Sequence, residues 1–203
     1  MSSESIKNTF SLLIITLVAG LLLGLVYEIT KNPIAKEQQK AKEEAYKEVF
    51  IDADSFEEIV LDGQSNREFK KQGWDAVIDE AMKVFDKDKN EIGYVLTVTD
   101  HEGYGGDIQF AMGVRSDGTL NGISFLSLSE TAGLGMKAKE DEFKGQFTNK
   151  NVESFTYTKN GAVAEEEIDA ISGATITTNA VTNGVNAGLY YISTLELWRW
   201  VYE

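Results

Sequence analysis

Residues 93–126 read GYVLTVTDHEGYGGDIQFAMGVRSDGTLNGISFL and are the most informative part of the chain for its architecture. They contain three short apolar segments, Gly93 to Thr99, Ile108 to Val114 and Leu120 to Leu126. Segments of this length, rich in β-branched and aromatic residues, favour strands, and Ser116-Asp117-Gly118 is a turn-forming sequence. The pattern predicts consecutive hairpins in a largely antiparallel sheet.

Two further strand candidates precede this stretch, at Glu57 to Leu61 and at Glu80 to Phe85. Lys87-Asp88-Lys89-Asn90 predicts a turn before the strand that begins at Gly93, and Asn160-Gly161 predicts another turn later in the chain. We therefore expect the sheet to be built mainly from sequential hairpins.

Three helices are expected outside the sheet. Ile34 to Phe50 follows Asn32-Pro33 and is rich in Ala, Glu, Lys and Gln, a composition that favours a solvated helical stalk. Met136 to Phe147 is a second candidate, and Thr178 to about Trp198 is a third because its apolar residues recur at helical spacing. The expected fold class is α+β, with helices packed on the sheet.

The amino-terminal region contains a candidate membrane span. Between Lys7 and Glu28 lie 20 uncharged residues, Asn8 to Tyr27. At a helical rise of about 1.5 Å per residue, they cross roughly 30 Å of hydrocarbon. No A-x-A-like small-residue site follows Val26, so we expect an uncleaved anchor rather than a signal peptide.

Flanking charges do not settle which way this span is oriented. Lys7 and the amino terminus stand on one side of the apolar segment, facing Lys31, Lys36, Lys40 and Lys42 on the other. Taken literally, the excess of positive charge after the span would place the rest of the chain in the cytoplasm.

Composition excludes several classes of function. A net charge of -14 without a basic stripe argues against a nucleic-acid partner. With no Cys the chain cannot hold an iron–sulfur cluster or use a thiolate, and its one His, His101, cannot form a multi-histidine metal site. We expect no metal site and no catalytic residue, and we expect His101 to lie in a loop.

One motif stands where a predicted strand ends and the last helix begins: Asp169-Ala170-Ile171-Ser172-Gly173-Ala174-Thr175-Ile176-Thr177. The first turn of a helix has unpaired N–H groups and a positive dipole end, which suit a phosphate. Small residues at 172–174 allow close approach, and the hydroxyls of Ser172, Thr177 and Thr178 can donate hydrogen bonds. From these residues alone, a phosphate loop and an ordinary capped helix start both remain open.

Two glycine-rich segments are candidate walls of a ligand pocket, Gly103-Tyr104-Gly105-Gly106-Asp107-Ile108 and Ser129-Glu130-Thr131-Ala132-Gly133-Leu134-Gly135. In the first, glycines permit close backbone approach to a flat ring and Tyr104 can stack on it. In the second, Glu130 and Thr131 begin a flexible turn, and Leu134 with Met136 can cover an apolar face. A hairpin loop with a core tyrosine, followed by ordinary core packing at a helix start, explains the same residues.

These two segments, Phe143-Lys144-Gly145-Gln146-Phe147 and the motif at 169–177 occur in this order along the chain. Together they resemble the FMN-binding domain of the Rnf complex G subunit and its relative, the C subunit of the sodium-pumping NADH:quinone oxidoreductase. The resemblance is closer to Rnf. In that family a flavin transferase esterifies the phosphate of FMN to the last Thr of a D-x-x-[ST]-G-A-T motif, which is Thr175 in this chain, and Asp169 matches the acidic position.

The resemblance therefore implies FMN as a covalent cofactor, attached through phosphate to Thr175, with Asp169 serving recognition or transfer. Lys137 either contributes charge near the flavin or is an ordinary solvated lysine. The cofactor-binding residues implied are Ser172, Gly173, Ala174, Thr177, Thr178, Tyr104, Gly105, Gly106, Glu130, Thr131, Gly133, Leu134, Gly135 and Met136.

By the same resemblance, the chain is an electron-relay subunit of a membrane-bound ferredoxin:NAD oxidoreductase that moves Na⁺ or H⁺, and it is not catalytic alone. The implied partners are the other membrane subunits of an Rnf complex, including a second subunit with covalent FMN, and a flavin transferase during maturation. The implied location is the cytoplasmic membrane, with the soluble domain on the extracytoplasmic side despite the lysines after the span.

The expected organisation is a short segment at 1–8, a transmembrane helix at 9–30, a helical stalk at 31–55 and an FMN-binding domain at 56–203. Trp198, Trp200 and Tyr202 form an aromatic patch for a membrane surface, a partner or the domain's own core. Two alternatives stay open: a stand-alone membrane-anchored flavoprotein of another extracytoplasmic chain, and a cofactor-free binding or scaffold module.

Overall fold

The computed structural model describes residues 3–61 and 65–202, with side chains except at residues 3, 6, 65–66 and 196–202. The chain divides into two compact units, Met1–Ala41 and Lys42–Glu203. The side chains of Trp198, Trp200 and Tyr202 lie outside the described part, so the expected aromatic patch is not addressed.

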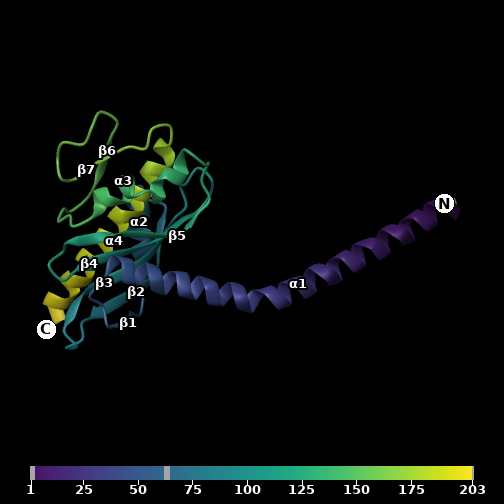
Figure 1. Ribbon diagram of the computed structural model, residues 1–203, viewed down its shortest axis with the longest axis horizontal. Helices are drawn as coiled ribbons and strands as arrows, with labels where there is room; N and C mark the ends of the chain where they lie inside the picture. The colour runs from purple at the N-terminus through teal and green to yellow at the C-terminus, as the bar shows by residue number, and fades with distance from the viewer. Residues whose placement is uncertain (1–2, 62–64, 203) are drawn as a thin grey trace. The chain divides into compact units, whose positions relative to one another are not determined.

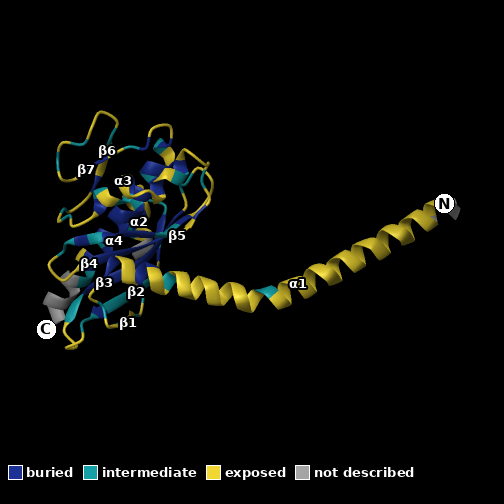
Figure 2. Cartoon of the chain, in the orientation of Figure 1, coloured by how far each residue is buried: buried dark blue, intermediate teal, exposed yellow. Residues whose placement is uncertain are grey.

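The first unit is a single helix. α1 spans Ser3–Val49 and continues through Pro33 without ending there. Pro33 removes one backbone hydrogen bond, which a long helix tolerates at a local cost. Apolar side chains between Phe10 and Ile29 are exposed on every side of the helix (Figure 2). A helix that is apolar all round requires an apolar environment, and this one is long and apolar enough to cross a membrane.

The second unit is built on a five-stranded sheet in which every neighbouring pair is antiparallel and the strand order follows the chain (Figure 1). The strands are β1 (Ser55–Ile59), β2 (Ala76–Phe85), β3 (Glu91–Asp100), β4 (Ile108–Arg115) and β5 (Leu120–Leu128). All five expected strands are present, and turns at 87–90 and 116–118 join hairpins as predicted. The α+β class with a largely antiparallel sheet is confirmed.

The central strand β3 explains why the sheet is covered on both faces. Its residues are buried from Gly93 to Asp100, and alternate side chains point to opposite faces of a strand. Leu96 and Val98 belong to the larger core cluster, whereas Val95 belongs to the smaller one. A strand buried on both sides needs a partner element on each face.

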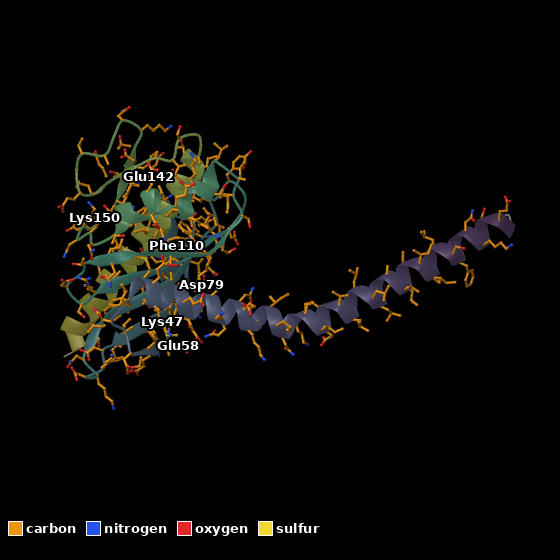
Figure 3. All side chains as sticks on the ribbon, in the orientation of Figure 1. Lys47, Glu58, Asp79, Phe110, Glu142 and Lys150 are labelled. Carbon is orange, nitrogen blue, oxygen red and sulfur yellow. The ribbon has the colours of Figure 1, made fainter. Side chains whose placement is uncertain are left out.

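α4 (Thr175–Tyr202) covers the first of these faces. A Cβ at Gly188 would lie 2.1 Å from Met112 Sδ, and one at Gly184 would lie 2.9 Å from Phe110 Cζ. Glycine at these two positions therefore lets the helix lie close to β4. Phe110 itself is fully buried in this core (Figure 3).

The last two turns of α1, which belong to the second unit, cover the other face. Ala45, Tyr46 and Val49 are buried there together with Phe50, which follows the helix. The expectation of a fully solvated stalk is therefore wrong for this end. The mixed Glu and Lys content of the segment hid these four buried positions, because some of its charged residues, Lys42 and Glu48, bond to the domain at the edge of the buried cluster.

The single helix expected at Met136 to Phe147 is wrong. The segment consists of η1 (Gly135–Lys139), α3 (Asp141–Lys144) and η2 (Gly145–Phe147), and Glu140 between the first two has extended backbone angles. Its buried side chains include Phe143 and Phe147, whose ring centroids are 5.7 Å apart. Burial of these side chains stabilises short irregular turns where sequence pattern alone favours a regular helix.

Two elements were not expected, a short helix and one strand of a small second sheet, whose other strand is the one predicted to end at the motif of 169–177. α2 (Ser65–Lys71) lies between β1 and β2 and buries Phe69, and a separate small sheet consists of β6 (Thr156–Thr158) and β7 (Glu167–Asp169). The β6–β7 pair is parallel, so Asn160-Gly161 lies in their connection and does not form the expected hairpin turn.

Candidate functional site

The motif at 169–177 forms a tight connection between β7 and α4. β7 ends at Asp169 and α4 begins at Thr175, three residues before the helix start expected from sequence. Gly173 has a φ of +79°, a left-handed conformation that L side chains rarely adopt. Thr175 is thereby placed in the first turn of a 28-residue helix.

The hydroxyl of Thr178 holds this connection together. Its Oγ1 donates to the carbonyl of Ala174 at 3.0 Å and accepts from the N–H of Ile171 at 3.0 Å. Thr178 is fully buried and does not line the nearby cavity. Its expected role in cofactor binding is therefore not supported by its position, which is structural.

Backbone donors are available at the start of α4. The N–H of Ala174 is bonded to the carbonyl of Ile171, and the N–H of Thr178 is bonded to the carbonyl of Ala174. Between them, the N–H groups of residues 175–177 have no backbone acceptor in the part of the chain that the structure describes. These groups and the positive end of the helix dipole suit an anion.

A cavity of about 520 Å³ opens beside this helix start. Three separate segments line it: the 103–107 loop, the turn at 130–135 and the first turn of α4. The lining residues are Tyr104, Glu130, Thr131, Leu134, Gly135, Gly173, Ala174, Thr175, Ile176 and Thr177. The volume falls in the range of small-molecule and cofactor sites.

Nine residues named from the sequence thus meet around one cavity, and seven do not line it. The latter are Thr178, Ser172, Gly105, Gly106, Gly133, Met136 and Asp169. Sequence analysis missed Ile176, whose side chain is 53% exposed. No signal in the sequence identified it, because the helix was expected to begin only at Thr178.

Close packing of glycines fixes the distances between the walls. A Cβ at Gly135 would lie 2.6 Å from Thr177 Oγ1 and 2.7 Å from Glu130 Oε2, so no larger residue fits between them. The N–H of Gly105 donates to Glu130 Oε1 at 3.3 Å. Gly105 therefore shapes the cavity through this contact, although it does not line it.

Apolar side chains stand at the mouth. Tyr104 is 70% exposed and Leu134 is 42% exposed, and both line the cavity together with Ile176. Large apolar side chains exposed side by side are costly in water and mark a binding surface. They supply flat or branched surfaces for an aromatic ring.

Among the lining residues, Glu130 alone carries a charge, and none is Lys, Arg or His. Lys137 does not line the cavity and is exposed. The expectation that it contributes charge near a flavin has no support in its position.

Asp169 is held by two neighbouring segments. Gln146 accepts the N–H of Asp169 at 2.7 Å through Oε1 and donates to its carbonyl at 3.3 Å through Nε2. The carboxylate of Asp169 accepts the N–H of Ala162 at 2.7 Å through Oδ1. The segment 143–147 singled out in the sequence thus fixes the residue that leads into the motif.

Two titratable groups lie near the base of the 103–107 loop. His101 is exposed, as expected, and its Nδ1 lies 2.9 Å from Asp107 Oδ1; this hydrogen bond raises the pKa of the imidazole. Asp100 is fully buried, and burial raises the pKa of its carboxyl to about 7. Its Oδ1 accepts the N–H of Glu102 at 2.8 Å, while Oδ2 has no partner in the described chain.

Comparison with known proteins identifies the family of this chain. The FMN-binding domain family matches residues 103–190, and the RnfG N-terminal region matches residues 1–49. The G subunit of the ion-translocating oxidoreductase complex of Methanosarcina acetivorans is 34% identical over 96% of this chain and 98% of its own length. This chain belongs to the RnfG family.

Other relatives of the RnfG family agree with this assignment. The G subunit of the proton-translocating ferredoxin:NAD(+) oxidoreductase complex of Clostridium ljungdahlii is 32% identical over 92% of this chain and 90% of its own length. Among solved structures, NqrC of Shewanella oneidensis is similar, with a TM-score of 0.46 and 20% identity over 53% of each chain. The sequence relatives confirm the resemblance to the Rnf complex that the motifs indicated.

The residues of the cavity fit a flavin mononucleotide. The mouth offers apolar surfaces for the ring, the turn at 130–135 offers hydroxyl and backbone groups, and the start of α4 offers free N–H groups for the phosphate. The backbone approaches closely at Gly135 and Gly173, where a side chain would collide with a wall residue or require a strained conformation. The chain therefore carries an FMN-binding domain.

Proposed function

We propose that this protein is an electron relay of an ion-translocating ferredoxin:NAD⁺ oxidoreductase complex, with FMN esterified through its phosphate to Thr175. The observation that carries the proposal is the position of the Thr175 side chain, which lines the cavity at the start of α4 without being buried. FMN supplies one- and two-electron transfer when it is bound. The chain's own task is to hold and orient it.

The surroundings of the motif support Thr175 over the other hydroxyls. Thr178 is buried and already engaged in two hydrogen bonds, and Thr177 is 1% exposed. Ser172 is exposed but does not line the cavity. Among the hydroxyls of the motif, an enzyme that modifies the folded protein therefore reaches one that is both accessible and lines the cavity, Thr175.

The charge balance of the cavity also favours an ester link. A free phosphate monoester carries a charge of about -1.5 to -2 at neutral pH, whereas a diester carries about -1. No lysine or arginine lines the cavity to balance the larger charge, and Glu130 adds a negative one. Esterification reduces the phosphate charge and retains the cofactor without cationic side chains.

Each wall has a defined part in orienting the ring. Tyr104, Leu134 and Ile176 give it apolar contacts, and Thr131 offers a hydroxyl to its polar edge. The N–H groups at the start of α4 hold the phosphate oxygens. Asp169 keeps the β7–α4 connection in place through Gln146 and Ala162, and we retain its recognition by a flavin transferase as part of the proposal.

The proposal includes membrane attachment through residues 9–30, supported by the exposed apolar surface of α1. It places residues 56–203 as the FMN-binding domain on the extracytoplasmic side, next to membrane subunits that include a second covalent-FMN protein. Protease treatment of intact cells after the outer barrier is opened should digest this domain. Full protection would reverse the proposed sidedness.

The experiment compares Thr175→Ala with Ser172→Ala in the full chain, each expressed with a flavin transferase. Denaturing gels viewed under ultraviolet light should show a fluorescent band for the unchanged chain and for Ser172→Ala, and none for Thr175→Ala. Loss of the hydroxyl removes the point of attachment, while Ala in the first turn costs at most about 1 kcal/mol of stability.

Circular dichroism of the Thr175→Ala chain provides the folding control and should match the unchanged chain. A fluorescent band that persists in Thr175→Ala would exclude Thr175 as the attachment site. A band that disappears in Ser172→Ala alone would move the attachment to Ser172.

A further inference from the structure

We propose that Glu130 links the 103–107 loop to the turn at 130–135 in the FMN cavity, and that its negative charge sets the reduction potential of the bound flavin to a low value. This inference rests on the proposed function, since it concerns the same cavity. It gives Glu130 a role in tuning the flavin potential, which is separate from folding and from the attachment of FMN.

Glu130 lies in the turn at 130–135 and contacts a second segment of the cavity, the 103–107 loop. Its Oε1 accepts the N–H of Gly105 in the 103–107 loop at 3.3 Å. Its Oε2 lies 2.7 Å from the position of a Cβ on Gly135, and the same position is 2.6 Å from Thr177 Oγ1 of α4. The carboxylate is therefore bonded to the loop and packed against Gly135, which in turn lies close to Thr177 of α4.

The charge of Glu130 is not balanced locally. Of the ten residues that line the cavity, the others are all uncharged. Among the side chains that the structure describes, Glu130 has no ion-pair partner within 4.0 Å. Its nearest identified donor is the neutral N–H of Gly105. The unpaired N–H groups of α4 lie at the motif, where the phosphate is expected.

An unbalanced carboxylate beside a flavin disfavours each added electron. Interactions between charges strengthen where water is excluded, and a ring bound against Tyr104, Leu134 and Ile176 would exclude water from this side of the cavity. Thr131 also lines the cavity, but its hydroxyl is uncharged and cannot shift the potential in this way.

Three variants of the full, flavinylated chain separate charge from packing. Glu130→Gln removes the charge but keeps an amide oxygen that can accept the Gly105 N–H, and Glu130→Ala removes both. Glu142→Gln is the matched control, because Glu142 is exposed on α3 and away from the cavity lining (Figure 3). The probe is the flavin absorbance during reductive titration with dithionite and mediators.

We expect Glu130→Gln and Glu130→Ala to raise the midpoint potential. The expected rise corresponds to at least a tenfold change in the ratio of reduced to oxidised flavin, which is about 30 mV for a two-electron couple. Glu142→Gln should leave the potential unchanged. Flavin content per chain should stay the same in Glu130→Gln, because the wall contacts are retained.

Each other outcome counts against a specific claim. Flavin present with an unchanged potential in Glu130→Gln would overturn the role of the charge while leaving the proposed function intact. A shift in Glu130→Ala alone would assign Glu130 to packing only, and an unloaded Glu130→Gln chain would also refute the proposal. Absence of flavin from the unchanged chain would overturn both proposals together.

Discussion

The two faces of the five-stranded sheet are built from different chemistry. On the α4 face, Leu96, Phe110 and Met112 belong to one apolar cluster, and the carboxyl of Asp100 is fully buried beside it. On the opposite face, the end of α1 buries a smaller cluster surrounded by polar contacts. There, Tyr46 Oη lies 2.8 Å from Thr97 Oγ1 and donates to Glu80 Oε2 at 3.0 Å.

The two faces of the sheet therefore have different tasks in the same domain. The α4 face positions the helix whose first turn lines the FMN cavity, so errors in its packing reach the site directly. The α1 face holds the end of the apolar amino-terminal helix, and it contributes no residue to the cavity. Stability and cofactor loading should therefore respond differently to changes on the two faces.

The largest effect is expected from paired substitutions of one buried phenylalanine on each face. Phe110→Ala and Phe50→Ala should each lower the free energy of unfolding by about 3–5 kcal/mol, because each leaves a large cavity. Only Phe110→Ala should also reduce flavin content, since Phe110 supports α4 near Gly184. Chemical denaturation of the full chain in detergent and flavin fluorescence per chain provide the two measurements.

Val163→Ala, at a position 92% exposed, is the control and should change neither quantity. Equal loss of flavin from Phe110→Ala and Phe50→Ala would remove the distinction between the faces. It would show that the domain responds as a single unit.

A smaller effect, with a defined pH dependence, is expected from Asp100. Because burial raises the pKa of its carboxyl from 3.8 to about 7, the native state favours the protonated form. Asp100 ionises first in the unfolded chain as pH rises, so its contribution to stability falls between about pH 4 and pH 7 and is constant outside this window. The full difference corresponds to an upper limit on the order of 4 kcal/mol.

Asp100→Asn should remove this dependence, because an amide does not ionise and its oxygen can still accept the Glu102 N–H. The measurement is the difference in unfolding free energy between variant and unchanged chain at a series of pH values. His101, Asp75 and Glu102 are the neighbouring charged groups, and they remain in both proteins. A difference that stays constant from pH 4 to pH 8 would contradict the buried, protonated carboxyl.

The smallest effect is expected from the polar contacts of the α1 face. Tyr46→Phe removes the hydroxyl from Thr97 and Glu80 while keeping the buried ring, so it should cost about 1–2 kcal/mol and leave flavin content unchanged. Tyr157→Phe, at a partly exposed position, is the matched control and should cost less than about 0.5 kcal/mol. A Tyr46→Phe chain as stable as the control would show that this network contributes nothing measurable.

Much of the sheet could be predicted because its information is local. Residues 93–126 alternate short apolar segments with turns, and β3, β4 and β5 follow that pattern closely. The helix expected at 136–147 could not be corrected from sequence, since the burial of Phe143 and Phe147 that breaks it depends on distant segments. The buried end of α1 was hidden for the same reason.

Part of the candidate site could also be predicted from the sequence. Glycine and hydroxyl residues in three segments identified its walls, and their meeting around one cavity depends on the antiparallel order that sequence also predicts. The burial of Thr178 and the exposure of Ile176 could not be foreseen, because the helix begins three residues earlier than its apolar spacing indicates. The roles of the individual residues in binding FMN stay predictions.

The central claim is tested most directly by mass spectrometry of peptides from the unchanged protein, isolated from its own membrane. The peptide that contains residues 169–177 should be heavier by the mass of FMN less one water, and fragmentation should place the addition on Thr175. An unmodified peptide at full recovery, or an addition on Ser172 or Thr177, would contradict the account.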